Sequence, residues 1–136
     1  MHAPETTRQE QAIVRRYMLV AERADLAMMA ELLAEDAVLT MPPNPLWFTG
    51  RQDILTFVAP SFDPGSPAYL GRWRHLPTQA NGRPALAGYV QRPGTTVYRA
   101  QNLDVLRTSG DRIVEITTFE PHLLAAFGLP MTLRQR

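Results

Sequence analysis

The feature that most restricts the fold of this chain is the pair Asn81-Gly82, which separates two strand-like segments. These segments, Arg72 to Ala80 and Arg83 to Val90, are each long enough to form a full strand. Asn and Gly tolerate the positive φ angles of a two-residue hairpin turn, so the two segments are predicted to pair antiparallel.

Two further reversals extend this hairpin into a meander of four strands. Arg92-Pro93-Gly94 leads into a predicted strand over Val97 to Arg107, and Ser109-Gly110-Asp111 leads into another over Arg112 to Phe119. A short helix is expected from Pro121 to Phe127, because proline suits the first position of a helix.

The first third of the chain is predicted to be mainly helical. Thr7-Arg8-Gln9-Glu10 has the spacing of a capping box, and apolar residues at helical intervals continue to Ala24. Asp25 is expected to cap a second helix, which ends at Glu35-Asp36 before a strand over Ala37 to Met41.

Proline dominates the segment that follows this strand. The prolines between Met41 and Leu46 predict a rigid loop, since proline cannot donate a hydrogen bond to a strand ladder. A third helix is predicted over Arg51 to Ala59, closed by Pro60 and followed by a loop.

This order of elements is typical of the α+β class. We expect a cone-shaped fold in which three helices from the first half of the chain pack on a strongly curved antiparallel sheet and enclose a pocket. Residues 1–136 are expected to form a single domain. The other face of the sheet is expected to contact solvent or the second copy of a homodimer.

Composition removes several kinds of chemistry. All 14 basic residues are arginine and cysteine is absent, which excludes a lysine Schiff base, a thiol nucleophile and a disulfide. The three histidines lack the spacing of a metal motif, so no metal or other cofactor is expected. A net charge of +1 without a basic run argues against nucleic-acid binding, and no apolar stretch approaches the ~20 residues of a membrane helix. The lack of cysteine favours a reducing compartment, and the cytoplasm is the expected location.

Four blocks of sequence carry a resemblance to a known family. They are Leu39-Thr40-Met41-Pro42-Pro43, Trp47-Phe48-x-Gly50-Arg51, Pro77-Thr78-x-Ala80-Asn81-Gly82-x-Pro84-Ala85 and Phe127-Gly128-Leu129-Pro130. In this order they resemble the SnoaL-like branch of the nuclear transport factor 2-like superfamily. Most similar is the SnoaL-like domain that follows the sigma regions in a group of extracytoplasmic-function sigma factors. The chain contains no sigma region, so it is not expected to bind polymerase and a promoter by itself.

Ketosteroid isomerase, another member of this superfamily, is also similar to the chain. Tyr17 falls on that family's oxyanion-hole tyrosine, and Asp104 falls on its protonated oxyanion-hole aspartate. The position of its catalytic aspartate base is occupied by Met41, whose side chain cannot take a proton. Limonene epoxide hydrolase, a third relative, uses an acid that would fall within Ala85 to Val90, and this chain has none there.

The strand face on which Asp104 lies decides between two roles for its carboxyl group. Alternation along the strand puts Leu103 and Val105 on the opposite face. If those two residues face the helices, Asp104 is a solvated outer carboxylate. If they face outward, Asp104 joins Asn102 in the pocket, where apolar surroundings raise a carboxyl pKa. Tyr17 is likewise either a hydrogen-bond donor in the pocket or an ordinary core tyrosine.

Further candidates for the pocket come from several segments. The side chains expected to contact a ligand are Met41, Trp47, Trp73, Asn102, Thr118 and Glu120. His75 could act as a base near neutral pH, although a lone histidine in a strand is more often structural or exposed. Glu120-Pro121-His122 is either a proton-transfer pair at the cavity rim or a capping acid beside a surface histidine.

Two functions follow from these residues. The first is a domain with a hydrophobic pocket that binds a small molecule or a partner and acts in regulation, in association with the transcription machinery where it is part of a sigma factor. The four matched blocks and the missing base at Met41 favour it. The alternative is a cofactor-independent isomerase, cyclase or hydrolase in which Tyr17 and Asp104 stabilise an oxyanion. In that enzyme His75, Glu120 or water would move the proton.

Overall fold

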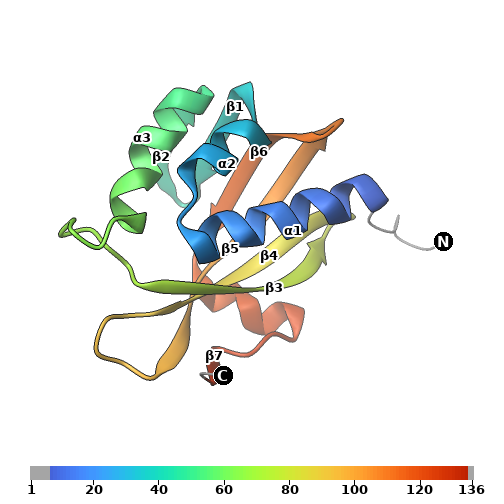
Figure 1. Cartoon of the computed structure of the whole chain (residues 1–136). Coiled ribbons are helices and arrows are strands. Elements are labelled where there is room, and N and C mark those ends of the chain that lie inside the picture. Colours follow the sequence, from blue (N-terminus) through green and yellow to red (C-terminus); the bar gives the residue numbers. More distant parts are fainter. Residues whose placement is uncertain (1–6, 135–136) are drawn as a thin grey trace.

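A computed structural model describes residues 7–134 of the chain. The elements are α1 (Arg8–Arg23), α2 (Leu26–Leu32), β1 (Leu33–Met41), β2 (Asn44–Thr49), α3 (Arg51–Phe62), β3 (Arg72–Ala80), β4 (Arg83–Gln91), β5 (Val97–Ser109), β6 (Arg112–Phe119), the 3-10 helix η1 (Pro121–Phe127) and β7 (Thr132–Arg134). The three α-helices lie on one side of a bent sheet, and η1 lies on the other (Figure 1). The α+β class predicted from the element order is confirmed.

Both predicted helix caps are present. The Thr7 hydroxyl accepts a hydrogen bond from the Glu10 amide at 3.1 Å, and the Glu10 carboxylate accepts one from the Thr7 amide at 2.9 Å. These bonds satisfy two backbone donors that the first turn of α1 leaves free. The Asp25 carboxylate accepts from the Met28 amide at 3.0 Å and caps α2 in the same way.

The sheet contains the predicted meander. Its strand order is β2-β1-β6-β5-β4-β3, and every neighbouring pair from β6 to β3 is antiparallel. Asn81 and Gly82 have φ angles of 53° and 76°, which are the positive values that the hairpin between β3 and β4 requires. The sheet is mixed rather than wholly antiparallel, because β1 runs parallel to β6.

The segment around the prolines differs from its prediction. Residues 44–49 form a strand instead of a loop, with Pro45 in the edge strand β2 at a register shift, where it has no paired residue on β1. The second helix ends at Leu32 instead of Asp36, because the buried Leu33 already pairs with Ile113. Helix α3 runs past Ala59 and holds Pro60 in its last turn, where proline removes only one hydrogen bond.

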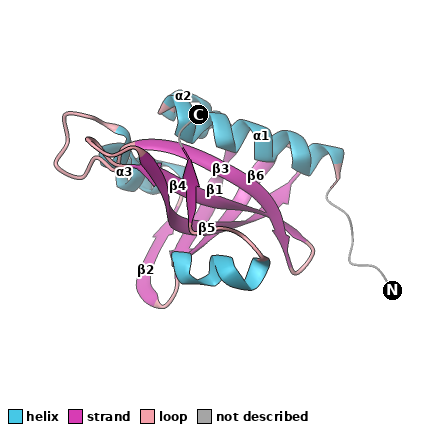
Figure 2. Ribbon diagram, turned by 90° about the horizontal axis from the view of Figure 1, so that it is seen from below, coloured by secondary structure: helices cyan, strands magenta, loops and turns pink. Residues whose placement is uncertain are grey.

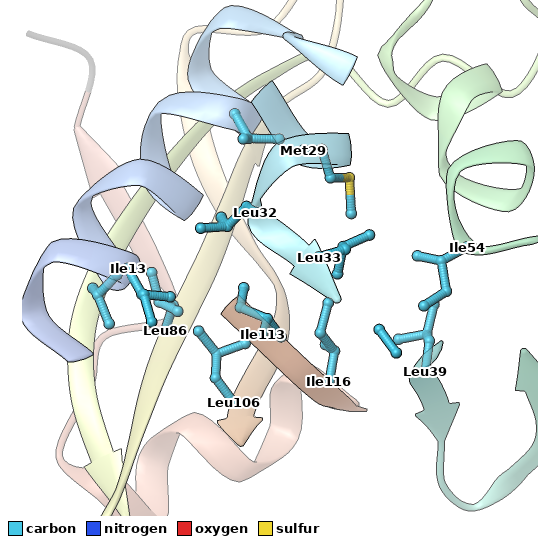
Figure 3. Close-up of a cluster of buried hydrophobic side chains, with 13 residues drawn as sticks. Ile13, Met29, Leu32, Leu33, Leu39, Ile54, Leu86, Leu106, Ile113 and Ile116 are labelled. Atoms are coloured by element: carbon cyan, nitrogen blue, oxygen red, sulfur yellow. The ribbon is translucent and has the colours of Figure 1, made fainter. Parts of the chain in front are cut away.

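The main core lies between the α-helices and the inner face of the sheet. Its members are Ile13, Val14, Val20, Met29, Leu32, Leu33, Ala37, Leu39, Ile54, Leu86, Leu106, Ile113 and Ile116. Ile13 of α1 approaches Leu86 of β4, and Ile54 of α3 lies beside Leu39 of β1 (Figure 3). The apolar sides predicted for α1 and α3 therefore bury against strands that are distant in sequence.

The outer face of the sheet is partly covered by the end of the chain itself. Leu124 of η1 is fully buried in a second cluster with Leu103 of β5 and Tyr89 of β4. The Tyr89 hydroxyl donates to the Pro130 carbonyl at 2.7 Å, and β7, which was not predicted, pairs with β5. Figure 2 shows η1 beneath the strands, on the side opposite to α1 and α2. Within residues 7–134 no helix is long and apolar enough to cross a bilayer.

Candidate ligand-binding site

A cavity of about 340 Å³ lies between the α-helices and the inner face of the sheet. Its apolar wall comes mainly from α1, α2, α3 and the loop after α3: Val20, Ala21, Met29, Phe57, Val58, Pro60, Phe62, Ala68 and Leu70. Its titratable groups are carried by Tyr17 of α1, His75 of β3 and Asp104 of β5, and further polar side chains come from Ser61, Gln101 and Asn102. An apolar cavity with a few polar side chains is the usual form of a small-molecule site.

Asp104 lies on the inner face of β5. Leu103 packs outward in the cluster with Leu124, so alternation turns Asp104 toward the helices, where it is only 5% exposed. The Tyr17 hydroxyl donates to Asp104 Oδ2 at 2.6 Å, and the Thr118 hydroxyl donates to Asp104 Oδ1 at 2.7 Å. Thr118 is the cross-strand neighbour of Asp104 on β6. Each carboxyl oxygen is thus held by one hydroxyl group.

Burial governs the ionisation of this pair. Desolvation raises the pKa of Asp104, and the hydrogen bonds from Thr118 and Tyr17 oppose that rise because they stabilise the carboxylate. The pKa of Tyr17 lies well above its usual value, first because of desolvation and then because of the charge of Asp104 and their hydrogen bond. Tyr17 therefore remains a neutral donor throughout the physiological range.

His75 is a buried neutral base beside this pair. Its ring stacks on Trp73 with a centroid distance of 5.5 Å and an interplanar angle of 7°, and it meets the Tyr17 ring edge-on at 6.2 Å. Desolvation lowers the pKa of His75 to about 4. The imidazole is consequently uncharged at pH 7 and can accept or donate a hydrogen bond.

Three buried polar atoms around the cavity lack a hydrogen-bond partner within the described part of the chain. They are Trp73 Nε1, His75 Nδ1 and Asn102 Oδ1. All three residues line the cavity. Buried polar atoms are normally paired, so this concentration is typical of a site completed by another molecule.

Gly88 shapes this end of the cavity, and the sequence analysis missed it. It pairs with His75 on one side and with Asn102 on the other. A Cβ atom at Gly88 would collide with Asn102 Oδ1 and would lie 2.8 Å from Trp73 Cζ3. The available signal was a glycine inside a predicted strand, which often marks a close approach of other groups.

The remaining predicted site residues line the main cavity, line an adjoining cavity or lie on the surface. Met41, Trp73 and Asn102 line the main cavity, and their contact with a ligand stays a prediction. Thr118 and Glu120 line an adjoining cavity of about 280 Å³, which shares Met41 and Asn102 with the first.

Two predicted rim features lie on the surface. Trp47 is 69% exposed on β2, where its Nε1 donates to the Thr49 hydroxyl at 3.0 Å, and it is not among the residues that line either of these cavities. His122 Nδ1 lies 3.6 Å from Glu120 Oε2, with both side chains largely exposed.

The sequence also matches the model of a known protein family. A family model described as the SnoaL-like domain matches residues 14–116. The chain belongs to the SnoaL-like domain family.

This SnoaL-like domain is similar in sequence to a sigma factor and in fold to several solved structures. The chain is 32% identical to the ECF RNA polymerase sigma factor SigG of Mycobacterium tuberculosis over 137 aligned residues, covering 98% of this chain but only 35% of the sigma factor. A steroid delta-isomerase from Pseudomonas aeruginosa has a similar structure, with a TM-score of 0.63 and 18% identity over 85% of this chain and 82% of its own. An NTF2-like protein of unknown function from Mesorhizobium loti superposes with a TM-score of 0.64 and 21% identity, over 88% of this chain and 96% of its own. The two structures share the fold, and the chain spans about a third of the sigma factor.

Within residues 7–134 no group of three His, Asp or Glu side chains is arranged to hold an ion. The chemistry that the site can offer is hydrogen bonding and proton transfer by Tyr17, His75 and Asp104 against an apolar wall.

Proposed function

We propose that this SnoaL-like domain binds a small, predominantly apolar molecule in the cavity between its α-helices and the sheet, and that occupancy of the cavity has a regulatory role. The observation that carries the proposal is the buried carboxyl group of Asp104 inside a mainly apolar cavity of about 340 Å³. A polar group at one end and an apolar wall elsewhere fix the orientation of a ligand. The similarity to SigG supports the regulatory role and an association with the transcription machinery.

Ligand binding is favoured over catalysis because the hydroxyl groups of Tyr17 and Thr118 already donate their hydrogen bonds to Asp104. Tyr17 has one hydroxyl hydrogen, and it is directed to Asp104 instead of into the cavity. Thr118 occupies the second carboxyl oxygen. Met41 lines the cavity, and the resemblance to ketosteroid isomerase assigns its position to the catalytic base; a thioether cannot accept a proton from carbon.

Tryptophan fluorescence offers a direct test of binding. The chain has two tryptophans, and Trp47→Phe leaves Trp73 in the cavity wall as the single reporter. We expect apolar fluorescent probes such as anilinonaphthalene sulfonate, and neutral polycyclic compounds, to quench or shift Trp73 emission in a saturable manner. A linear, non-saturable response to every probe would count against the proposal.

Two matched substitutions distinguish probe binding in the cavity from probe binding on the surface. Ala21 is buried and lines the cavity, so Ala21→Leu should fill part of it and weaken probe binding. Ala27 is exposed on α2, so Ala27→Leu adds the same atoms outside the cavity and should leave binding unchanged. Equal effects of the two substitutions would place the probe elsewhere.

A second candidate function is cofactor-independent proton transfer at carbon. It is favoured by the contact of Tyr17 with Asp104, a pair able to stabilise an oxyanion, and by the neutral imidazole of His75 in the same cavity. The enzyme would exchange the α-protons of a bound cyclic ketone for deuterium, which NMR detects without knowledge of the natural substrate. Exchange that is lost in both His75→Phe and Asp104→Asn would favour an enzyme over a regulatory module.

A further inference from the structure

The charges around the cavity are all of one sign. Neither the main cavity nor the adjoining one has an arginine among its lining residues, although the chain has 14 basic residues. Asp104 lines the first cavity and Glu120 lines the second. A buried carboxylate without a cation nearby is costly, so it must either stay protonated or receive a positive charge from a ligand.

Asp104 and Asn102 both carry acceptor sites that no donor fills. A carboxylate has about four acceptor sites, of which the hydroxyl groups of Tyr17 and Thr118 fill two. Asn102 lies two residues before Asp104 on the same face of β5, roughly 7 Å along the strand, and its Oδ1 lacks a donor. A ligand group with several N–H donors would satisfy acceptors on both residues.

The wall of the cavity is aromatic as well as apolar. Tyr17, Phe57, Phe62 and Trp73 all line the cavity. The faces of aromatic rings carry partial negative charge and attract organic cations. An anionic ligand, in contrast, would meet one carboxyl group and no cation among the lining residues.

We propose that the ligand of this cavity is an apolar amine, which binds as an ammonium ion with its N–H groups on Asp104 and its hydrocarbon part against the helices. This inference rests on the proposed function, since it names the chemical class of the bound molecule. It also explains why a buried acid is placed where two hydroxyl groups hold its oxygens toward the cavity.

A series of adamantane compounds of similar shape tests whether the cavity prefers a positively charged ligand. Adamantylamine, adamantanol, adamantanone and adamantane carboxylate differ in one polar group and are titrated into the Trp47→Phe protein or followed by calorimetry. We expect the amine to bind roughly ten- to a hundredfold more tightly than the alcohol or ketone, because a hydrogen bond to a charged group is about twice as strong as a neutral one. Preference for the ketone, alcohol or carboxylate overturns the inference and leaves the proposed function standing. Absence of saturable binding for all four, together with absence of binding for larger apolar probes, overturns the proposed function itself.

Asp104→Asn removes the charge and keeps the shape of the side chain. The amine should lose its preference over the alcohol, whereas the alcohol should bind about as before. Asp111 is 79% exposed in the turn between β5 and β6, so Asp111→Asn removes the same charge from the surface and should leave the preference intact. An unchanged preference in Asp104→Asn, or an equal loss in both variants, contradicts the inference.

A fixed-charge ligand provides a test on the unmodified protein. The charge of trimethyladamantylammonium does not titrate and its nitrogen carries no hydrogen, so the pH dependence of its binding reports on the charge of the protein alone and tests the charge attraction of the inference. Besides Asp104, the titratable groups that line the cavity are Tyr17 from α1 and His75 from β3, and α2, α3 and β1 contribute none; Glu120 lies in the adjoining cavity. Affinity should fall as the pH drops through the raised pKa of Asp104, because protonation removes its negative charge. Affinity that is constant, or that rises on acidification, overturns the inference.

Discussion

At the scale of single residues, burial shifts the protonation of His75 and Asp104 in opposite directions. Desolvation disfavours the charged form of each group, so it lowers the pKa of the imidazole and raises that of the carboxyl group. Both groups are therefore driven toward neutrality inside the cavity. These shifts couple the stability of the fold to pH in ways that can be measured separately.

His75 should make the protein less stable in acid. Its pKa is 6.5 in a solvated chain and about 4 in the folded protein, so between these values the unfolded state binds the additional proton. Stability from this residue is complete above about pH 6.5 and is lost as the pH falls toward 4, by up to about 3 kcal/mol. Urea unfolding of the wild type and of His75→Phe across this range should show the shallower pH dependence in the variant. His122→Gln, at an exposed histidine on η1, serves as the control and should keep the wild-type slope.

Asp104 should make the protein less stable as the pH rises, which is opposite to the effect of His75. Its folded pKa lies above the value of 3.8 in a solvated chain, so the folded state holds its proton more tightly and stability falls as the pH rises from 3.8 to the folded pKa. Asp104→Asn cannot ionise. Its free energy of unfolding relative to the wild type should therefore increase with pH, as measured by urea unfolding between about pH 4 and about pH 8. A relative stability that decreases with pH would show that Tyr17 and Thr118 stabilise the carboxylate by more than burial disfavours it.

At the scale of elements, local patterns predicted the meander well and the segments around it less well. The boundaries of β3 and β6 agree with prediction to the residue, since each is bounded by turn residues. The segment 44–49 was expected to be a loop because proline opposes pairing, yet at a sheet edge one side of a strand needs no partner. Edge position is a property of the assembled sheet and is not encoded locally.

The cavity face of β5 shows the same limit. The register between β4 and β5 shifts between Gly88 and Tyr89, so Gln101 and Asn102, which are consecutive, both line the cavity. Such a bulge changes which residues share a face, and alternation alone could not choose the face of Asp104. The hydrophobic residues on either side of Asp104 also pack well, against η1 instead of the helices.

Strand β4 leads to a prediction about Gly88. The cross-strand row His75, Gly88 and Asn102 leaves room for the Trp73 ring only because Gly88 has no Cβ. Gly88→Ala should destabilise the protein by about 1–3 kcal/mol through overpacking, and should weaken probe binding because Asn102 or Trp73 must move. Gly65→Ala is the control, since a Cβ there meets only Asp63 Oδ1 at 3.4 Å in an exposed loop. If both variants unfold at the same urea concentration as the wild type, the close packing at Gly88 is absent.

At the scale of the whole molecule, the sheet is covered on both faces by the same chain. The α-helices cover the inner face and enclose the cavity, while η1 covers part of the outer face and β7 pairs with β5. The sequence analysis expected solvent or a second copy there, because η1 was predicted without its packing partner. Homodimer formation stays a prediction, to be measured by analytical ultracentrifugation.

The coverage of the outer face by η1 can be tested at Leu124. This side chain is fully buried in one cluster with Leu103 and Tyr89, on the sheet face opposite to the cavity. Leu124→Ala should cost about 2–5 kcal/mol of unfolding free energy, as buried leucine truncations do, and should expose the end of the chain to hydrogen exchange. Leu46 is 40% exposed on β2, so Leu46→Ala should change stability by no more than about 0.5 kcal/mol. Because Leu124 lies on the opposite face from Asp104, probe affinity per folded molecule should be unchanged in Leu124→Ala. A large loss of affinity in that variant would mean that the outer cover and the cavity are coupled through β5.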